Sequence, residues 1–525
     1  MQTLDLIIIF GYLIGVTLFG VWFSGRQQTT EDYFVGDRSV PWWAIAASIV
    51  ATETSTITFI SVPGIAFAKG GNFQFLQLVF GYMLGRVVIS LLFIPMYFKG
   101  ELLTVYQLLG ERFGTKVKML ASALFVVMRN IADGIRLLLT AIVLAAVYTA
   151  FQPQTNSDLV IVGSVILLGV VMIIFTYYGG MEAVIWVEVV QLGIYIGGAI
   201  AAAIVIANQI EGGFSGAAAI GGQFNKFNLF DFTFDATKTF TFWAGLIGGC
   251  FLTMSTHGTD QYLVQRYLCT DKPNRAALAL LSSGAVVLGQ FIGFLFIGVL
   301  LFAYYHPFTD PLYSQSMEAC VKLFGELDKR CLDPALAAGA TNFFPFKGGD
   351  QVFPNFITQH MPTGLSGLVV AAIFAAALSS SLNSITATFV NDLYKPFKPG
   401  KDDKHFLRVS HWLTLIVGVV QIVVALVLMK TNSSALSQAL SVASLINGPI
   451  LGVFLVGAFL KKAKEIHALI GMGTSIVLML YILFGTKIAW TWYAFIGSLT
   501  TLLVAWLASL IIRGNDRGKV SPLES

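Results

Sequence analysis

The chain has 525 residues, of which 56% are hydrophobic and 11% are charged, and its formal net charge at pH 7 is +4. Soluble domains carry about 25% charged residues, so this composition, with a mean hydropathy of +0.77, excludes an ordinary soluble globule. Repeated apolar runs of about 20 residues match the length that crosses a hydrocarbon core. We therefore predict an all-α membrane protein whose surroundings are a lipid bilayer, with no nucleic-acid partner.

In chain order, the apolar runs predict about thirteen transmembrane helices. The first is expected to be a retained helix rather than a signal peptide, because no positive residue precedes it and no small-residue cleavage site follows it. The approximate ranges of the predicted helices are 4–24, 42–68, 74–98, 119–150, 158–178, 183–208, 241–266, 276–305, 363–388, 407–429, 434–460, 466–485 and 488–512.

Lys and Arg residues in the loops indicate the orientation, because cytoplasmic loops carry an excess of them. With the N-terminus outside, the inner loops and the C-terminal tail hold 20 of these residues and the outer loops hold nine. An odd number of helices also requires the two termini to lie on opposite sides. We therefore expect a multi-pass protein of the plasma (inner) membrane with its N-terminus outside and its C-terminus in the cytoplasm.

The two longest loops, 209–240 and 306–362, both fall outside in this orientation. The second contains Cys320 and Cys331, and an oxidising compartment permits a disulfide between them. The alternative is two unpaired thiols. The sequence has no P-loop and no Cys/His cluster with zinc spacing, so we expect neither ATP hydrolysis nor enzymatic activity.

Polar groups inside apolar runs are expensive in a membrane and are therefore functional candidates. The stretch VATETSTITF (50–59) places five hydroxyls and the carboxylate of Glu53 in the second predicted helix. Pro63 and Gly64 follow, where the helix can break, and a broken helix frees carbonyls that can bind Na⁺ near the bilayer midplane. The alternative is that the hydroxyls join neighbouring helices.

A second polar cluster lies in FAAALSSSLNSITATF (374–389). Its three alanines allow another helix to approach closely, and its three successive serines supply oxygens. A small-residue packing face would explain the alanines but not the serines. Because sodium is a hard cation that binds several oxygens, we predict an ion site here.

Glu188 lies about six residues, or roughly 9 Å along a helix, from Glu182, which is expected to be solvated at a cytoplasmic turn. A carboxylate at this depth needs a cation or a proton. The sequence leaves three alternatives open, which are a second sodium ion, titration, and an ion pair with an arginine.

Arg129, Asp133 and Arg136 are spaced so that all three lie on one helix face. Asp133 can neutralise only one of the two arginines. The other positive charge could meet an anionic substrate group or Glu53. The alternative is an ion-pair network that locks helices together.

The stretch MSTHGTDQYLVQRYL (254–268) contains a Thr-His-Gly-Thr-Asp-Gln run that predicts local unwinding of its helix. We consider His257 and Gln261 as substrate contacts, and likewise Gln74 and Gln77 at the outer end of the third predicted helix. The alternative for each is a structural role. Together the polar clusters predict a chamber halfway across the membrane with ion sites beside it.

Four stretches carry a family resemblance: TTEDYFVGDRSVPWWAIAASIVAT (29–52), YYGGMEAVIWVEVVQ (177–191), DQYLVQRYL (260–268) and GLSGLVVAAIFAAALSSSLNSITATFVNDLY (364–394). In this order they resemble the sodium/solute symporter family, which includes sodium/glucose, sodium/proline and sodium/sialic acid transporters. The resemblance covers nearly the whole chain.

The resemblance implies the LeuT-type fold, in which two inverted repeats of five helices form the core. One helix and an inner loop (1–41) come first, and two trailing helices with a cytoplasmic tail (461–525) come last. The repeats would occupy 42–208 and 241–460, joined by the outer loop 209–240, with the outer loop 306–362 inside the second repeat.

The resemblance also implies a sodium ion where the first helix of repeat one meets the third helix of repeat two. Some members hold a second sodium with a carboxylate that matches Glu188, where an aspartate is usual. The stretch AAALSSSLNS is about three residues shorter than the family's run, which leaves open which ion its serines would bind. The matching positions for the first sodium are the carbonyls of Ala51, Thr54 and Ala376 and the hydroxyls of Ser379 and Ser380.

Substrate contacts implied by the resemblance match Glu53, Ser55, Thr58, Gln77 and Arg136. Many relatives have a small or hydroxyl residue in place of Glu53. A carboxylate there would disfavour a simple anion unless Arg136 offsets its charge.

We therefore expect a monomeric Na⁺-coupled symporter that imports a small polar organic solute (sugar, sugar acid, carboxylate or amino acid) by alternating access. The alternative is a proton-coupled or uncoupled carrier of the same fold that uses Glu188 or Glu53. An ion channel is disfavoured because one chain with inverted repeats has no symmetric pore ring.

Overall fold

The computed structural model describes residues 2–22, 28–54, 56–100, 102–152, 154–309, 346, 348–378, 381–429 and 435–512. These residues form helices and loops, with no strand among them. Cys320 and Cys331 lie outside the described residues, so their pairing stays a prediction. The helices are α1 (Thr3–Trp22), α2 (Thr30–Val35), α3 (Trp42–Glu53), α4 (Thr56–Phe67), α5 (Leu76–Tyr97), α6 (Tyr106–Arg112), α7 (Thr115–Phe151), α8 (Ser157–Ala207), α9 (Gly213–Gln223), α10 (Gly249–Gly258), α11 (Gln261–Leu268), α12 (Pro273–Thr309), α17 (Gly349–His360), α18 (Leu365–Leu378), α19 (Leu382–Thr388), α20 (Asp403–Leu428), α21 (Ala435–Phe459), α22 (Glu465–Gly485) and α23 (Tyr493–Ile511).

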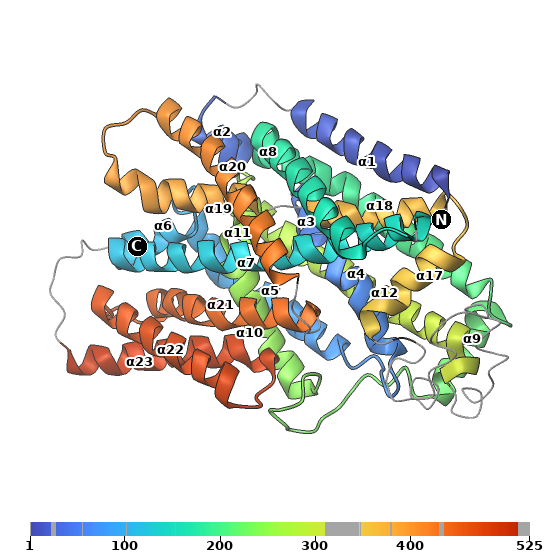
Figure 1. Ribbon diagram of the computed structural model, residues 1–525. Helices are drawn as coiled ribbons and strands as arrows, with labels where there is room; N and C mark the ends of the chain where they lie inside the picture. The colour runs from blue at the N-terminus through green and yellow to red at the C-terminus, as the bar shows by residue number, and fades with distance from the viewer. Residues whose placement is uncertain are drawn as a thin grey trace.

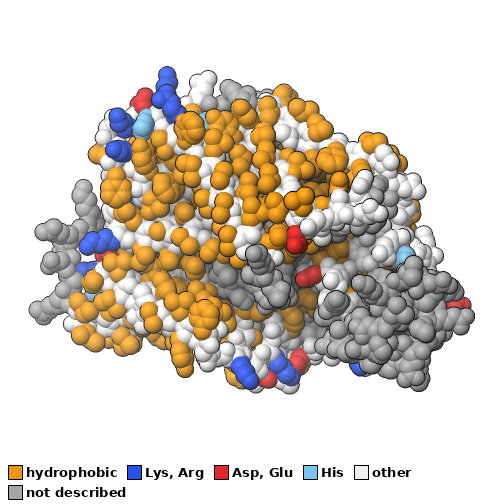
Figure 2. Space-filling model, in the orientation of Figure 1, with side chains coloured by type: hydrophobic (Ala, Val, Ile, Leu, Met, Phe, Trp, Pro, Cys, Tyr) orange, Lys and Arg blue, Asp and Glu red, His pale blue; other side chains and the backbone are white. Residues whose placement is uncertain are grey.

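The long helices are gathered into one bundle (Figure 1). One end of the bundle carries α9 and α17, and the opposite end carries α2 and α6; we call these the α17 end and the α6 end. Among the described residues, seven helices are long and apolar enough to cross a membrane, and the bent pair α3–α4 makes an eighth. Apolar side chains cover most of the face seen in Figure 2, and Lys and Arg side chains lie at its periphery. This distribution suits a multi-pass membrane protein.

Three of the predicted helices are interrupted. The helix predicted over 42–68 is divided into α3 and α4, whose axes make an angle of 60°. The second is divided into α10 and α11, as the Thr-His-Gly-Thr-Asp-Gln run predicted. The third is divided into α18, which ends at Leu378, and α19, which begins at Leu382. The predicted turn at Gly179–Gly180 is also confirmed, because Gly180 has a positive φ of 61° inside α8.

The break in the first of these helices does not lie where Pro63 and Gly64 suggested. α4 continues through both residues, and the chain instead leaves the helix at Thr54, whose φ and ψ are −83° and 76°. The Thr54 hydroxyl donates to the carbonyl of Val50 at 2.6 Å. Threonine side chains compete for helix carbonyls in this way, so the hydroxyl cluster itself contains the break.

Two close contacts hold pairs of helices together, α1 with α18 and α5 with α10. Asp5, fully buried in α1, accepts hydrogen bonds from Gly364 N (2.7 Å), Ser366 Oγ (2.8 Å) and Gly367 N (2.9 Å), so it caps the N-terminus of α18. A Cβ added to Gly81 of α5 would lie 2.2 Å from the carbonyl oxygen of Gly245, just before α10, and 2.9 Å from the backbone nitrogen of Cys250 in α10. Only glycine allows this approach, which brings α5 and α10 together.

Candidate functional site

The break between α3 and α4 carries the first part of the site. Glu53 is the last residue of α3, where the helix presents its partially negative end. A carboxylate there needs a positive partner. Glu53 Oε2 accepts a hydrogen bond from Arg86 Nη2 of α5 and lies 3.5 Å from His257 Nε2 of α10.

This Glu53–Arg86–His257 cluster joins three helices in the interior of the bundle. The Arg86 and Glu53 side chains are 1% and 14% exposed. His257 Nε2 also lies 3.4 Å from Arg86 Nη2, and its Nδ1 lies 3.0 Å from Thr256 Oγ1. Arg86 therefore supplies the positive charge beside Glu53, a role that the sequence had suggested for Arg136.

Arg86 was not among the predicted site residues. Its only signal was an arginine in the apolar run LGRVVIS, which marks a buried charge but does not identify its partner. The partner lies 33 residues away on another helix. Thus only the three-dimensional arrangement of α3, α5 and α10 reveals the cluster.

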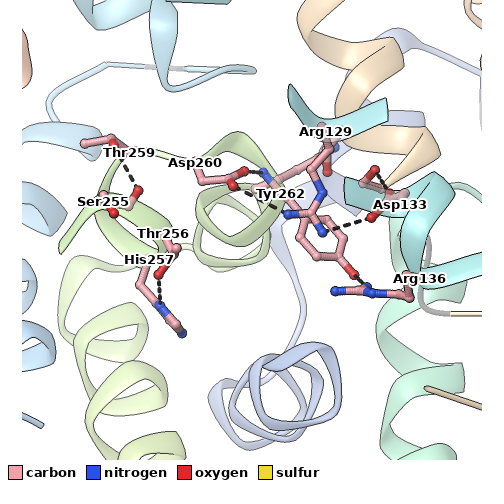
Figure 3. Close-up of polar contacts among 12 residues, drawn as sticks. Arg129, Asp133, Arg136, Ser255, Thr256, His257, Thr259, Asp260 and Tyr262 are labelled. Atoms are coloured by element: carbon pink, nitrogen blue, oxygen red, sulfur yellow. Dashed lines mark hydrogen bonds and ion pairs between the residues drawn. The ribbon is translucent and has the colours of Figure 1, made fainter. Parts of the chain in front are cut away.

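A second cluster surrounds Tyr262, near the start of α11 (Figure 3). The guanidinium carbons of Arg129, Arg266 and Arg136 lie 3.9, 4.7 and 5.8 Å from the centre of its ring. Arg136 Nη1 also donates to the Tyr262 hydroxyl at 3.1 Å. Cation–π contacts of this kind are favourable in desolvated sites. Tyr262 thus holds α11 against α7.

Two carboxylates balance the charge of Arg129 in this cluster. Its Nη2 donates to Asp133 at 3.1 Å, and its Nη1 lies 3.6 Å from Asp260, the residue that caps the N-terminus of α11. Asp133 in turn accepts a hydrogen bond from Ser381 Oγ, directly before α19. The expected alignment of Arg129, Asp133 and Arg136 on one face of α7 is confirmed (Figure 3).

Glu188 of α8 is 1% exposed and pairs with Arg266 of α11. The guanidinium donates from Nη2 to Oε1 at 2.6 Å and from Nε to Oε2 at 3.3 Å. Ser48 donates to Oε2 and Thr52 donates to Oε1 at 3.1 Å. Each carboxylate oxygen therefore has two donors, so a sodium ion could bind here only by displacing one of them.

Other predicted substrate residues have structural partners. The Gln77 amide donates to the carbonyls of Gln74 (3.1 Å) and Phe240 (3.3 Å) and accepts from Asp231 N (3.0 Å). Gln74 N donates to Asn72 Oδ1 at 2.9 Å. These contacts tie the start of α5 to the loop 224–243, and a substrate role for either glutamine stays a prediction.

Gln261 also has both amide atoms engaged. It accepts from Val105 N at 2.7 Å and donates to the Leu103 carbonyl at 2.9 Å, beside the start of α6. Thr58 is buried and its hydroxyl lies 3.5 Å from the Glu53 carbonyl. A substrate role for each of these two residues stays a prediction.

The predicted sodium ligands fall beside two of the helix breaks. Ala51 and Thr54 are buried in and just after the last turn of α3, where carbonyls lack a following helical turn. Ala376 lies in the last turn of α18. Ser379 and Ser380 lie outside the described residues, so the ligand set as a whole stays a prediction, as does the substrate contact predicted for Ser55, which also lies outside them.

At the α17 end, Lys226 holds the end of α4. Its ammonium is buried and donates to the carbonyls of Ala66 (3.0 Å), Phe67 (3.1 Å) and Ala68 (2.6 Å), and it lies 4.0 Å from the ring centre of Phe302. Burial lowers the pKa of Lys226 to about 8. A cation at a helix C-terminus satisfies carbonyls that would otherwise lack donors.

The described residues contain no group of three or more His, Cys, Asp or Glu side chains placed to hold a metal. What they offer instead is hydroxyls and carbonyls at helix breaks, beside buried ion pairs. These groups can bind a dehydrated monovalent cation and a polar solute.

Comparison with known proteins agrees with this chemistry. Residues 33–475 match the model of the "Sodium:solute symporter family". The sodium/sialic acid symporter NanT of Aliivibrio fischeri is 31% identical over 98% of this chain and 94% of its own length, and the sodium/sialic acid symporter SiaT of Proteus mirabilis is 30% identical over 96% and 94%. The human sodium-coupled monocarboxylate transporter 1 is 28% identical over 92% of this chain and 74% of its own length.

Solved structures show the same fold. A Na⁺-coupled sialic acid symporter in a substrate-bound outward-open state superposes with a TM-score of 0.80 at 28% identity, covering 98% of both chains. MhsT in complex with L-phenylalanine shares the fold at a TM-score of 0.51 and 16% identity, over 90% of this chain and 99% of its own. The protein therefore has the LeuT-type fold and belongs to the sodium:solute symporter family, whose members are Na⁺-coupled carriers rather than enzymes.

Proposed function

We propose that this protein uses an inward sodium gradient to import a small polar organic solute, with a sugar acid as the first candidate. The observation that carries the proposal is the break at Thr54 beside the Glu53–Arg86–His257 cluster. Sodium would bind at the negative ends of half-helices, which is where broken helices coordinate it. The sialic acid symporters among the relatives favour a sugar acid.

Ala51, Thr54, Ala376, Ser379 and Ser380 would form the sodium site. Sodium bound by the C-terminal ends of α3 and α18 would hold the two helices together. Glu188 is the weaker candidate for a second site, because its oxygens are occupied by Arg266, Ser48 and Thr52.

The solute would bind next to the break, in contact with Glu53, Ser55, Thr58 and His257, with further contacts from Gln74, Gln77, Arg136 and Gln261. Arg86 neutralises Glu53, so the cluster does not repel an acidic sugar as an isolated carboxylate would. The hydroxyls of the Thr-rich stretch can bind sugar hydroxyls.

The cycle would be alternating access in the plasma membrane by a monomer, with the α17 end and the N-terminus outside and the C-terminus in the cytoplasm. The repeats would be 42–208 and 241–460. On the cytoplasmic side, the Tyr262 cluster would close the path between α7 and α11. Sodium and solute would each raise the affinity for the other by the same factor.

Uptake into proteoliposomes tests the proposal. Labelled sialic acid, lactate and glucose are offered with an inward sodium gradient and with potassium in its place, at equal membrane potential. We expect accumulation of one solute only with sodium. Uptake that ignores sodium but follows a proton gradient would instead support a proton-coupled carrier that uses Glu53 or Glu188.

Ser380→Ala then tests the ion site. We expect it to raise the sodium concentration for half-maximal uptake about tenfold, while the half-saturating solute concentration at saturating sodium changes little. Normal sodium dependence in this variant would remove Ser380 from the ion site without affecting the assignment of the solute.

A further inference from the structure

Gln290 of α12 meets the break between α3 and α4. Its amide oxygen lies 2.7 Å from the hydroxyl oxygen of Thr54, the first residue after α3. The backbone N–H of Thr54 donates to the Val50 carbonyl at 2.9 Å, and its hydroxyl lies 2.6 Å from the same carbonyl. Gln290 therefore joins a third helix to the residue at which the chain leaves α3.

The proton count at this contact defines the orientation of the Gln290 amide. A hydroxyl has one proton and can accept from other donors. If the Thr54 proton goes to the carbonyl of Val50, the atom of Gln290 that faces Thr54 must be the amide nitrogen. The two ends of an amide are assigned from such networks. Gln290 then donates to Thr54, and Thr54 donates to Val50.

The surroundings of Gln290 do not explain why a polar side chain lies there. It lines a cavity of about 350 Å³ between α8 and α12, and the other residues lining this cavity are aliphatic, aromatic or glycine. In either orientation only one end of the amide faces Thr54, and the other end is left buried without a hydrogen-bond partner in the described part of the chain. Leaving such a group unpaired costs about 1–3 kcal/mol. A leucine would fit this apolar cavity without that penalty.

The cavity also means that packing from that side does not immobilise Gln290. Its hydrogen bond to Thr54 adds a polar contact to the packing of α12 against α3 and α4. Thr54 is fixed through its N–H, its hydroxyl and Gln290, and its non-helical ψ of 76° turns its carbonyl away from the axis of α3. This carbonyl is one of the two that α3 would offer to sodium.

We propose that Gln290 is a positioning residue of the sodium site, which holds the Thr54 hydroxyl so that the Thr54 carbonyl faces the ion. This inference rests on the proposed function. Gln290 would not touch the ion itself. It would act by keeping the break in the geometry that binds sodium, and would thereby couple α12 to ion binding.

The test is sodium-dependent uptake by Gln290→Leu in proteoliposomes. Because the net value of one such hydrogen bond is about 0.5–1.5 kcal/mol, we expect the half-saturating sodium concentration to rise about three- to tenfold. The solute affinity at saturating sodium should stay within about twofold. The thermal stability of the purified variant should be equal or higher, since an orphaned amide is removed.

The control is Gln421→Leu. Gln421 is a buried glutamine of α20 whose amide atoms also lack partners in the described part of the chain, and we expect its sodium dependence to be unchanged. Thr54→Val keeps the carbonyl but removes the hydroxyl. If Gln290 acts through this hydroxyl, the double variant should resemble the more impaired single variant instead of showing additive losses.

The outcomes separate the two proposals. Unchanged sodium affinity in Gln290→Leu, or additive effects with Thr54→Val, would overturn the role of Gln290 while wild-type coupling stands. Uptake by the wild-type protein without any sodium dependence would instead refute the proposed function. A parallel change in Gln421→Leu would show that loss of any buried amide has this effect, and would also overturn the proposal.

Discussion

Burial of Lys226 predicts that the stability of the fold rises with pH. A lysine in a stabilising ion pair would have the opposite effect. The ammonium is buried beneath Phe302 and donates to three carbonyls at the end of α4. No carboxylate pairs with it among the described residues. Burial therefore dominates, and it lowers the pKa from 10.5 to about 8.

The sign of the effect follows from proton linkage. Between pH 8 and 10.5 the folded protein has lost the Lys226 proton while the unfolded chain keeps it. The unfolded state thus binds more protons, and stability must rise with pH in this window. Each pKa unit corresponds to 1.36 kcal/mol, so this lysine should add about 1.3 kcal/mol between pH 7 and pH 9.

The assay compares the melting temperatures of wild-type protein and Lys226→Met in detergent between pH 7 and pH 10. We expect the difference, wild type minus variant, to become more positive as pH rises through 8. Lys238→Met is the matched control, because Lys238 lies in the same loop with its side chain 53% exposed. A constant difference between Lys226→Met and wild type would refute the burial of a charged lysine.

Substitutions at three other positions test other contacts of the structure. Glu188→Gln should lower the melting temperature markedly, because it leaves Arg266 as a buried unpaired charge at a cost of about 3–5 kcal/mol. Glu188→Asp should lower the melting temperature less. Equal melting temperatures for Glu188→Gln and the wild-type protein would contradict the ion pair. Tyr262→Phe keeps the stacked ring but loses the hydrogen bond to Arg136, so we expect a stability loss of about 1 kcal/mol, whereas Tyr262→Ala should lose several times more; equal losses would argue against the cation–π stack. Asp5→Ala should expose the N-terminus of α18 at a cost of about 1–2 kcal/mol, measured as a lower melting temperature, and an unchanged value would show that the cap is not needed.

The helices could be predicted from the sequence because each is a long apolar run, and each predicted range falls on a helical segment. The interruption at Gly258–Asp260 could also be predicted, since Thr, Gly and Asp in sequence disfavour a helix. The position of the first break could not. Proline at position 63 suggested a break there, but α4 continues through Pro63 and the threonine hydroxyl ends α3 ten residues earlier.

The sequence also did not predict which residues pair with the buried charges. Glu53, Glu188 and Arg136 were recognised as charges that need partners, yet each has several arginines or hydroxyls within reach on other helices. Arg86 meets His257 because glycines let α5 approach α10 closely, and Arg266 comes near Glu188 because α11 packs against α3, which itself packs against α8. Which of these groups pair depends on how the helices pack, and the sequence of a single helix does not reveal that packing.

The buried polar contacts also constrain how the protein can move. Glu188–Arg266, Arg129–Asp260 and the Glu53–His257 contact each join a helix before residue 208 to one after residue 241. Opening Glu188–Arg266 or Arg129–Asp260 would leave a buried charge without a partner across this division, at a cost of about 3–5 kcal/mol, whereas Glu53 would keep Arg86 if it lost His257. A transport cycle that separates the two halves must therefore exchange these partners for water, sodium or solute, or must move the paired helices together. Both oxygens of Glu188 already accept hydrogen bonds from Arg266, Ser48 and Thr52, so exchanging its partners is the more expensive course for this pair. We infer that α3, α8 and α11 move as one body around Glu188.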